Sequence, residues 1–217
     1  MDYEEIKNAV LRDGFFSVED TVIGARVDGF AREKYPFQTM QGLALLQATL
    51  DDERVRNTVE SLLDRCGLGM FKVFGPHPDT ARALLNRTTD KLLALTTILC
   101  PKASRLILFE DSHRHALAAE PGGTGQLELP RETMTERGFR EKQIDLDEGG
   151  LVIIDGRLFT TIVQGAMLGI AFAVPEELGH WAKMPYPNSA DLQNKVRTMD
   201  SEKIQMNIKF VAAKRLK

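Results

Sequence analysis

The stretch that decides the fold runs from Gly149 to Val174 and reads GGLVIIDGRLFTTIVQGAMLGIAFAV. It is rich in Val, Ile, Leu and Phe, which is typical of strands that are buried in a sheet. Asp155 and Gly156 form a turn dipeptide between two apolar runs, because both residues suit the backbone of a tight turn. We therefore predict a buried β-hairpin, or at least paired strands. Arg157 lies in the turn, where it could also serve as a pocket cation.

Outward from this stretch, the chain changes character near Cys66. Apolar residues at helical spacing predict a helical part over 1–66, and a β-rich part follows over 67–217. The spacing predicts helices over 3–12, 21–35, 41–50, 52–66, 79–85 and 132–140. It predicts strands over 15–18, 70–74, 91–99, 104–110, 142–147 and 203–212, and an irregular segment over 179–189. This order predicts a single α+β domain over 1–217, mainly β, built around an antiparallel sandwich or barrel.

The composition excludes several classes of protein. Twenty-eight basic residues stand against 31 acidic ones, a net charge of −3, so there is no electrostatic case for nucleic acid. No stretch reaches the ~20 apolar residues that a membrane span needs, and the charged N-terminus lacks a signal-peptide core. We therefore expect a cytoplasmic protein. Cys66 and Cys100 form no CxxC motif, and two buried thiols are expected rather than a disulfide.

Three segments carry a resemblance to a known family. They are IKNAVLRDGFFSVED (Ile6–Asp20), LILFEDSHRHAL (Leu106–Leu117) and GGLVIIDGRL (Gly149–Leu158). In this order they resemble phytanoyl-CoA dioxygenase-like proteins of the iron/2-oxoglutarate oxygenase superfamily, and among these a short, degenerate, fungal-type branch. The resemblance implies a double-stranded β-helix, that is, a cupin-like jelly roll, with flanking N-terminal helices.

The same resemblance implies an Fe(II) site made of two histidines and one carboxylate, with open positions for 2-oxoglutarate and oxygen. His77-Pro78-Asp79 supplies a His-x-Asp triplet, although a histidine in such a Pro/Gly-rich turn can also be merely solvated. The third histidine is expected within 159–161, where the chain reads Phe-Thr-Thr. The arginine expected for the 2-oxoglutarate carboxylate is missing from AMLGIAFAV. We therefore favour a protein without a cofactor, and keep Fe(II) and 2-oxoglutarate as the alternative.

Other side chains could carry chemistry. His113, Arg114 and His115, with Glu120 five residues further on, match half of a cupin metal motif if they lie on a strand, though they can equally decorate a strand end. Lys72 shares a face with Met70 and Phe74 and could point into the barrel or extend out of it. As acid–base candidates we name His113, His115, Lys72 and Asp155, and as substrate contacts Arg157, Phe74 and Thr161.

Three functions follow from these observations. The first is a non-redox enzyme, of isomerase or cyclase type, that acts on a small hydrophobic natural-product-like substrate on a degenerate oxygenase scaffold. The second is an Fe(II)/2-oxoglutarate-dependent oxygenase with unusual ligands, using His77 and Asp79. The third is a ligand-binding pseudo-enzyme. A small hydrophobic substrate is the expected partner in each case, and a homodimer is compatible with all three.

Overall fold

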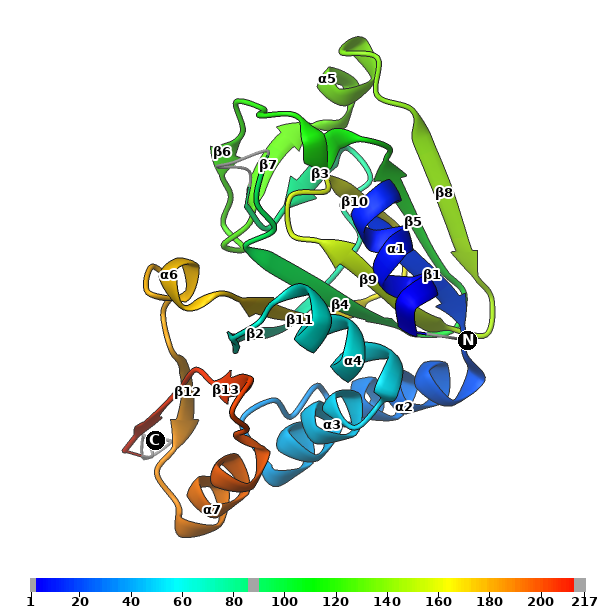
Figure 1. The fold of residues 1–217 in the computed structure, drawn as a ribbon. Coiled ribbons are helices and arrows are strands. Elements are labelled where there is room, and N and C mark those ends of the chain that lie inside the picture. Colours follow the sequence, from blue (N-terminus) through cyan, green and yellow to red (C-terminus); the bar gives the residue numbers. More distant parts are fainter. Residues whose placement is uncertain (1–2, 86–89, 213–217) are drawn as a thin grey trace.

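The computed structural model describes residues 3–85 and 90–212, and its body is a pair of facing β-sheets (Figure 1). The major sheet has the strand order β1-β9-β4-β11-β2-β13, and the minor sheet has the order β6-β7-β3-β10-β5-β8. Every pairing in them is antiparallel except that of β13 with β2. The strands of the major sheet are β1 (Phe15–Glu19), β2 (Cys66–Phe74), β4 (Ala94–Cys100), β9 (Gly150–Asp155), β11 (Met167–Ala173) and β13 (Ile204–Met206). Those of the minor sheet are β3 (Thr80–Ala83), β5 (Ser104–Phe109), β6 (Glu120–Pro121), β7 (Leu127–Pro130), β8 (Glu141–Leu146) and β10 (Thr160–Gln164).

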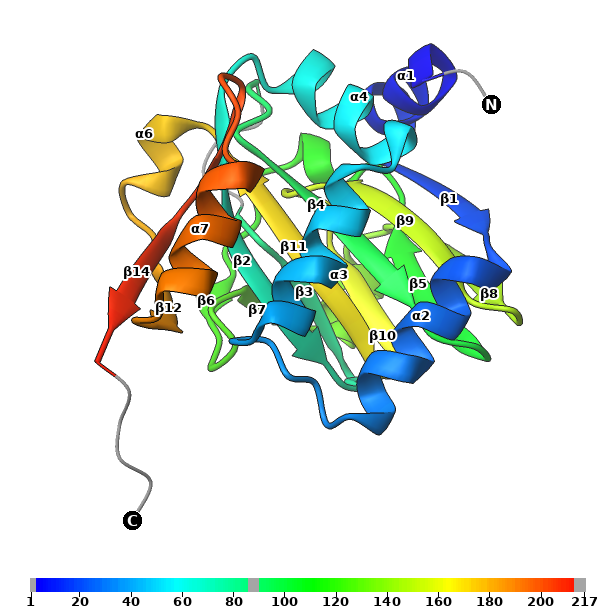
Figure 2. The same ribbon diagram turned by 90° about the horizontal axis from the view of Figure 1, so that it is seen from below.

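Helices α2, α3 and α4 cover the outer face of the major sheet, as Figure 2 shows, whereas α5 contacts β3 and β7 of the minor sheet. The described helices are α1 (Tyr3–Asp13), α2 (Thr21–Arg32), α3 (Met40–Leu50), α4 (Glu53–Leu62), α5 (Arg131–Glu136), α6 (Pro175–Leu178) and α7 (Ala190–Met199). Asp20 caps α2 by accepting hydrogen bonds from the backbone N–H groups of Val22 and Ile23 at 2.9 and 3.1 Å. Burial of the apolar helix faces against the sheet stabilises this layer more than helix propensity does. The prediction of a mainly β jelly roll with N-terminal helices is confirmed.

The prediction of a hairpin within 149–174 is wrong. The stretch forms three strands, and successive strands lie in different sheets: β9 in the major sheet, β10 in the minor sheet and β11 in the major sheet again. β9 pairs with β1 and β4, whereas β10 pairs with β3 and β5. Local sequence cannot distinguish a hairpin from strands in two sheets, because an apolar strand can pair with strands of either sheet. Alternation between sheets is the feature that makes a double-stranded β-helix.

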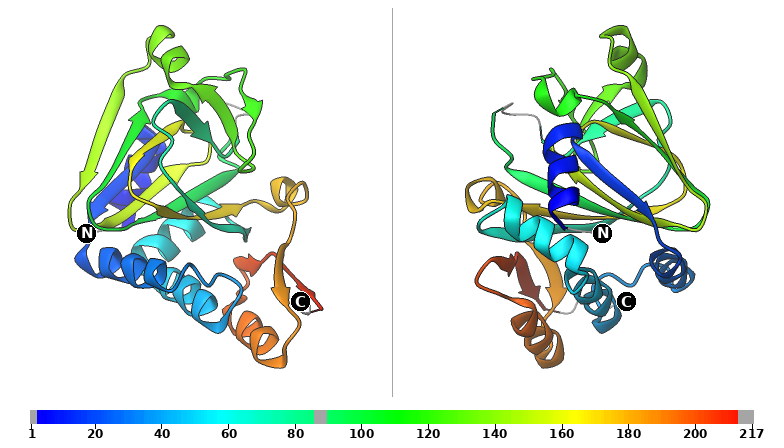
Figure 3. Two further views of the ribbon diagram at one scale, coloured as in Figure 1. Left: turned by 180° about the vertical axis from the view of Figure 1, so that it is seen from behind. Right: turned by 45° about the vertical axis from the view of Figure 1, so that its right-hand side comes forward.

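Three other segments differ from prediction. The helix expected over 79–85 is strand β3, because its backbone pairs with β7 on one side and with the start of β10 on the other. The strand expected over 203–212 is interrupted at Asn207, so that β13 joins the major sheet while β14 (Ile208–Val211) pairs with β12 (Met184–Pro187). The segment 179–189, expected to be irregular, contains β12. Figure 3 shows these C-terminal elements gathered at the β2 edge of the major sheet.

The space between the two sheets is filled with apolar side chains, among them Met70, Phe74, Ile98 and Leu108. Phe74 occupies the room that a side chain at Gly169 would need, since a Cβ atom there would lie 2.6 Å from the Phe74 ring. The barrel interior in the described residues is therefore a packed core at this level. The expectation of free thiols is confirmed, because both cysteines are buried and unpaired. In the described residues, no helix combines the length and apolar character that crossing a membrane requires.

Candidate functional site

A groove runs along the edge of β2, with a cavity of about 710 Å³. β2 pairs with β11 along Gly67–Phe74, but on its other side β13 reaches only Cys66–Leu68. From Gly69 to Phe74 no described strand covers this second edge, and the segment 180–186 lines the opening instead. A cavity of this size matches those that hold small organic molecules, which occupy about 300–1,000 Å³.

The floor of the groove is apolar. Met70, Phe71, Trp181 and Tyr186 line it, and both β2 residues are buried. Tyr186 is itself buried, and burial raises the pKa of its phenol to about 12. The hydroxyl therefore stays protonated at neutral pH and can donate a hydrogen bond to a bound molecule.

The rim of the groove is cationic. Lys72, His180 and Lys183 line it, and no Asp or Glu of the described chain is among the lining residues. Across the major sheet, Lys72 is paired with Gly169, and Gly169 is paired with Ile98. Residues paired in this way point to the same face, and Ile98 belongs to the barrel core, so the side chain of Lys72 also leaves β2 on the barrel side. Its ammonium group nevertheless reaches solvent and donates a hydrogen bond to the Thr124 carbonyl oxygen at 3.2 Å. Of the two placements left open for Lys72, the structure therefore shows the extended one.

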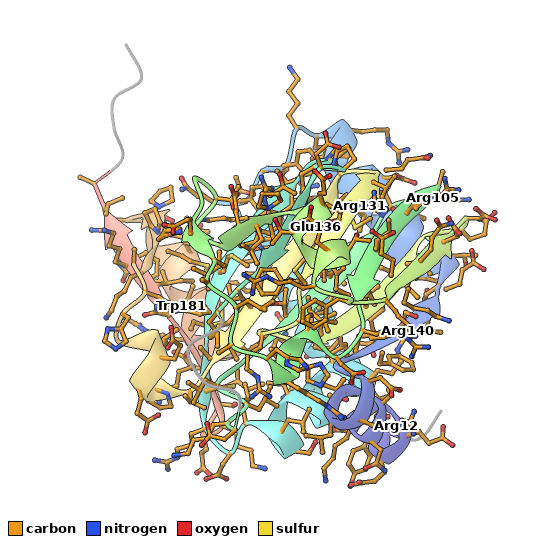
Figure 4. All side chains as sticks on the ribbon, turned by 90° about the horizontal axis from the view of Figure 1, so that it is seen from above. Arg12, Arg105, Arg131, Glu136, Arg140 and Trp181 are labelled. Atoms are coloured by element: carbon orange, nitrogen blue, oxygen red, sulfur yellow. The ribbon has the colours of Figure 1, made fainter. Side chains whose placement is uncertain are left out.

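Trp181 is held in place from two directions. Its indole Nε1–H donates to the Glu177 carboxylate at 2.9 Å, and its ring lies over Gly69, where a Cβ atom would approach the ring to 2.6 Å. Figure 4 shows Trp181 on the opposite side of the molecule from Arg105, that is, away from the β5–β8 edge. Trp181 is the only tryptophan in the chain, so its fluorescence reports on the groove alone.

A second polar group faces the barrel near the end of β3. Arg82 lies opposite Thr160, which lies opposite the core residue Leu108, so all three side chains share the barrel side of the minor sheet. The Nε atom of Arg82 lies 2.9 Å from the carboxylate of Glu128 on β7. This cation is thus balanced by an acid from the neighbouring strand.

Three of the candidates named from the sequence come together elsewhere, beneath the turn between α1 and β1. Asp155 accepts bonds from the Arg157 side chain, from Nε at 2.9 Å and from Nη2 at 2.7 Å, and both residues are buried. His113 is 3% exposed, and neither ring nitrogen has a hydrogen-bond partner in the described structure. Burial lowers the pKa of His113, while Asp155 raises it and Arg157 lowers it further. Gly14 packs directly on the imidazole, because a Cβ atom there would lie 2.6 Å from Nδ1. None of these residues lines the groove.

The candidate metal ligands do not converge. The Nδ1 atom of His77 lies 2.8 Å from the Thr80 carbonyl oxygen, and the Thr161 hydroxyl donates to the same oxygen at 2.9 Å. Burial lowers the pKa of His77. Asp79 is exposed. The pKa of the Arg131 guanidinium is raised mainly by its hydrogen bond to the Glu141 carboxylate and, to a smaller extent, by the charge of Asp79. Thr161 is fully buried and therefore contributes to the sheet rather than to an open pocket.

The cupin-type arrangement fails for a conformational reason. His113 and His115 do not lie on a strand but in and after a short 3-10 turn (Ser112–Arg114), so their side chains do not share one face. His113 is buried, whereas His115 is exposed and stacks edge-on against Phe139, with ring centroids 5.4 Å apart. Glu120 is exposed on β6.

The described residues do not fit an iron centre of two histidines and a carboxylate. Within residues 3–85 and 90–212, no three His, Cys, Asp or Glu side chains lie close enough together to hold a metal ion. β11, where an arginine for the 2-oxoglutarate carboxylate was sought, is apolar and buried along its whole length. Arg82, a barrel-facing cation on β3 of the minor sheet, is already paired with Glu128.

Sequence reasoning missed most of the groove. Arg82, which faces the barrel nearby, had a usable signal, since the alternation Thr-Ala-Arg-Ala in 80–83 places Arg82 on one face and two alanines on the other. Trp181, Lys183 and Tyr186 had none, because they lie in a segment without periodicity that only the tertiary fold brings to β2. Phe74 was assigned to substrate contact, but its ring fills the barrel core against Gly169.

No protein-family model matches this sequence, and no curated protein matches it either. Solved structures do match in three dimensions. The chain is similar to the epimerase SnoN, solved with Fe3+, alpha ketoglutarate and nogalamycin RO, at a TM-score of 0.57 and 12% identity over 79% of this chain and 83% of that one. It is similar to HygX from Streptomyces hygroscopicus, solved with nickel and 2-oxoglutarate, at a TM-score of 0.55 and 10% identity over 87% and 93% of the two chains. It is also similar to EctD from S. alaskensis, solved with 2-oxoglutarate and 5-hydroxyectoine, at a TM-score of 0.53 and 11% identity over 81% of this chain and 77% of that one.

These neighbours correct one prediction and limit another. The expectation of a protein without a cofactor is contradicted, because structures of this fold were solved with iron, nickel and 2-oxoglutarate. The neighbours share the fold, and none of them points to the phytanoyl-CoA dioxygenase family or to a fungal source. The chain thus has the double-stranded β-helix fold of the iron/2-oxoglutarate-dependent enzymes.

Proposed function

We propose that this protein is an enzyme on the oxygenase scaffold, and that it binds a small, largely apolar substrate in the groove beside β2. The observation that carries the proposal is the groove itself, an opening of about 710 Å³ with an apolar floor and proton-bearing side chains at its rim. Pockets that combine an apolar lining with a few polar groups are the usual places for small-molecule chemistry.

Two kinds of reaction compete for this site. The first is an isomerisation or cyclisation, in which Lys72 and His180 move protons and the Tyr186 hydroxyl orients the substrate. One neighbour, SnoN, is an alpha ketoglutarate dependent epimerase, so epimerisation occurs on this fold together with that cofactor. His113, His115 and Asp155 remain predictions for acid–base roles that the groove does not require.

The second kind of reaction is an Fe(II)/2-oxoglutarate-dependent oxidation. The comparisons support it more directly than a cofactor-independent rearrangement, since the neighbours were solved with a metal and 2-oxoglutarate. When bound, iron and 2-oxoglutarate would supply the oxidising power of that chemistry. Because the described side chains do not form the expected metal site, no residue of this chain is assigned to hold them.

One experiment separates these possibilities. A library of small apolar metabolites is screened by Trp181 fluorescence, and each hit is incubated with and without Fe(II), 2-oxoglutarate and oxygen. Isomerisation by proton transfer yields a product whose mass is unchanged in H2O and which carries deuterium when formed in D2O. Oxidation yields succinate and a changed mass only with all three additions.

The variants Lys72→Gln and His180→Asn test whether the groove does the chemistry. Both should lose turnover in the first case, while Lys142→Gln, an exposed lysine on β8, should keep it. If ligands bind but no product forms, the protein is a binding protein and not an enzyme. If no compound in the screen binds, the groove is not the substrate site.

A further inference from the structure

We infer that the ligand of the β2 groove carries an anionic group, of the carboxylate or phosphate class, on an apolar body. This inference rests on the proposed function only in placing the ligand in the groove; it adds the chemical class that the groove selects. It depends on the distribution of charge, which the following contacts establish.

The charge of the groove departs from that of the whole protein. The chain has a net charge of −3, yet the groove is lined by two lysines and a histidine and by no acid of the described residues. In the described structure, neither Lys72 nor Lys183 forms an ion pair, whereas lysines elsewhere do, such as Lys102 with Glu148 at 2.6 Å. The ammonium group of Lys72 has three N–H donors; one donates to the Thr124 carbonyl oxygen, and the other two can donate to a ligand.

Glu177, the acid that contacts Trp181, does not cancel this charge. Glu177 is buried behind Trp181, accepts the indole N–H, and does not line the groove. The side of Trp181 that faces the cavity is therefore apolar, and the cations lie at the rim around it. An amphipathic anion fits both parts: its body packs on Met70, Phe71 and the indole, and its charged end meets the lysines.

The Tyr186 hydroxyl strengthens this preference. Burial raises its pKa to about 12, so at neutral pH the phenol keeps its proton, carries no charge and can donate a hydrogen bond to a ligand. The two ammonium groups only donate, and the phenol can add one more donor. Such a set suits an oxyanion, and the positive charge of the two lysines disfavours a ligand ammonium group.

The test compares three probes with the same chain and different heads: octanoate, 1-octanol and octyltrimethylammonium. Binding is followed by Trp181 fluorescence at low ionic strength and checked by calorimetry. We expect octanoate to bind most tightly and octyltrimethylammonium least, and we expect added salt to weaken octanoate binding alone. Lys72→Gln and Lys183→Gln should each weaken octanoate binding by about three-fold and together by about ten-fold, as for solvent-exposed ion pairs.

Lys142→Gln on β8 is the matched control and should leave all three affinities unchanged. Equal affinity for octanoate and octanol, no effect of the two groove variants, or no binding of octanoate would each overturn the inference. These outcomes do not depend on turnover. If octanoate binds as expected but no substrate is ever converted, the proposed enzyme fails while the ligand class stands.

Discussion

The buried pair of Asp155 and Arg157 allows a sharp prediction about stability. The change Arg157→Met removes the two side-chain bonds to the Asp155 carboxylate, at 2.9 and 2.7 Å, and leaves only the bond from the Arg157 backbone N–H. The carboxylate is 3% exposed and cannot regain solvent without opening the turn between β9 and β10. Removing one partner of a buried ion pair costs about 3–5 kcal/mol. Whole domains have a free energy of unfolding of about 5–15 kcal/mol, so this single change should remove a large share of it.

The double variant Asp155→Leu/Arg157→Met distinguishes the electrostatic contribution of the pair from the packing contribution of its side chains. With both charges removed, only the Arg157 backbone N–H loses its acceptor. An unpaired neutral N–H costs less than an unpaired buried carboxylate, so the double variant should be more stable than Arg157→Met alone. Arg105→Met is the control, because Arg105 pairs with Asp145 at 2.6 Å but both side chains are about half exposed. Breaking that pair should cost less than about 1 kcal/mol.

The assay is urea unfolding followed by far-UV circular dichroism, with the slope m compared between variants. The pH dependence gives a second check: Arg157 lowers the pKa of His113 while Asp155 raises it, so His113 in the Arg157→Met variant should bind a proton more readily. The destabilisation should therefore shrink as the pH falls from 7 to 6. The reasoning fails if Arg157→Met costs no more than Arg105→Met, or if the double variant is as unstable as the single one.

Three further predictions follow from buried groups. Burial lowers the pKa of His113, so below pH about 6.5 the unfolded chain binds a proton that the folded protein does not. The free energy of unfolding should therefore keep its full His113 contribution above about pH 6.5 and fall as the pH drops below it. In the His113→Gln variant, the slope of the urea-derived free energy of unfolding against pH should be smaller by up to about 1.4 kcal/mol per pH unit. Gly169→Ala should cost about 1–3 kcal/mol in thermal unfolding through its contact with Phe74, and less in a Phe74→Leu background; equal costs in both would contradict the contact. Cys66 and Cys100 should resist thiol reagents in the native state and react after unfolding, since burial raises both thiol pKa values; fast native labelling would contradict their burial.

Much of the fold could be predicted because the signal is local. The Asp13-Gly14-Phe15 segment marks the end of α1 and the start of β1. In 204–210, apolar residues at every second position predict a strand with one buried face, a pattern that any sheet can accommodate. The same locality explains the error over 149–174. Whether β9 turns back on itself or crosses to the other sheet depends on β1, β3, β4 and β5, which come from distant parts of the chain.

The candidate site divides in the same way. The sequence by itself identified Lys72 as a barrel-side lysine on a strand, and brought attention to His113, Asp155 and Arg157, which do meet in space. It could not show that these three form a closed, buried cluster rather than an open pocket, because burial is a property of what covers a residue.

Tertiary structure alone decided where the groove lies. The groove exists because β13 pairs with only the first part of β2, leaving Gly69 to Phe74 uncovered, and because α6 returns Trp181 and Lys183 to that edge. The sequence determined which strands are apolar, since hydrophobic burial acts residue by residue along the chain. It did not determine which strand edge stays open, because strand pairing is set by backbone hydrogen bonds that carry no side-chain identity.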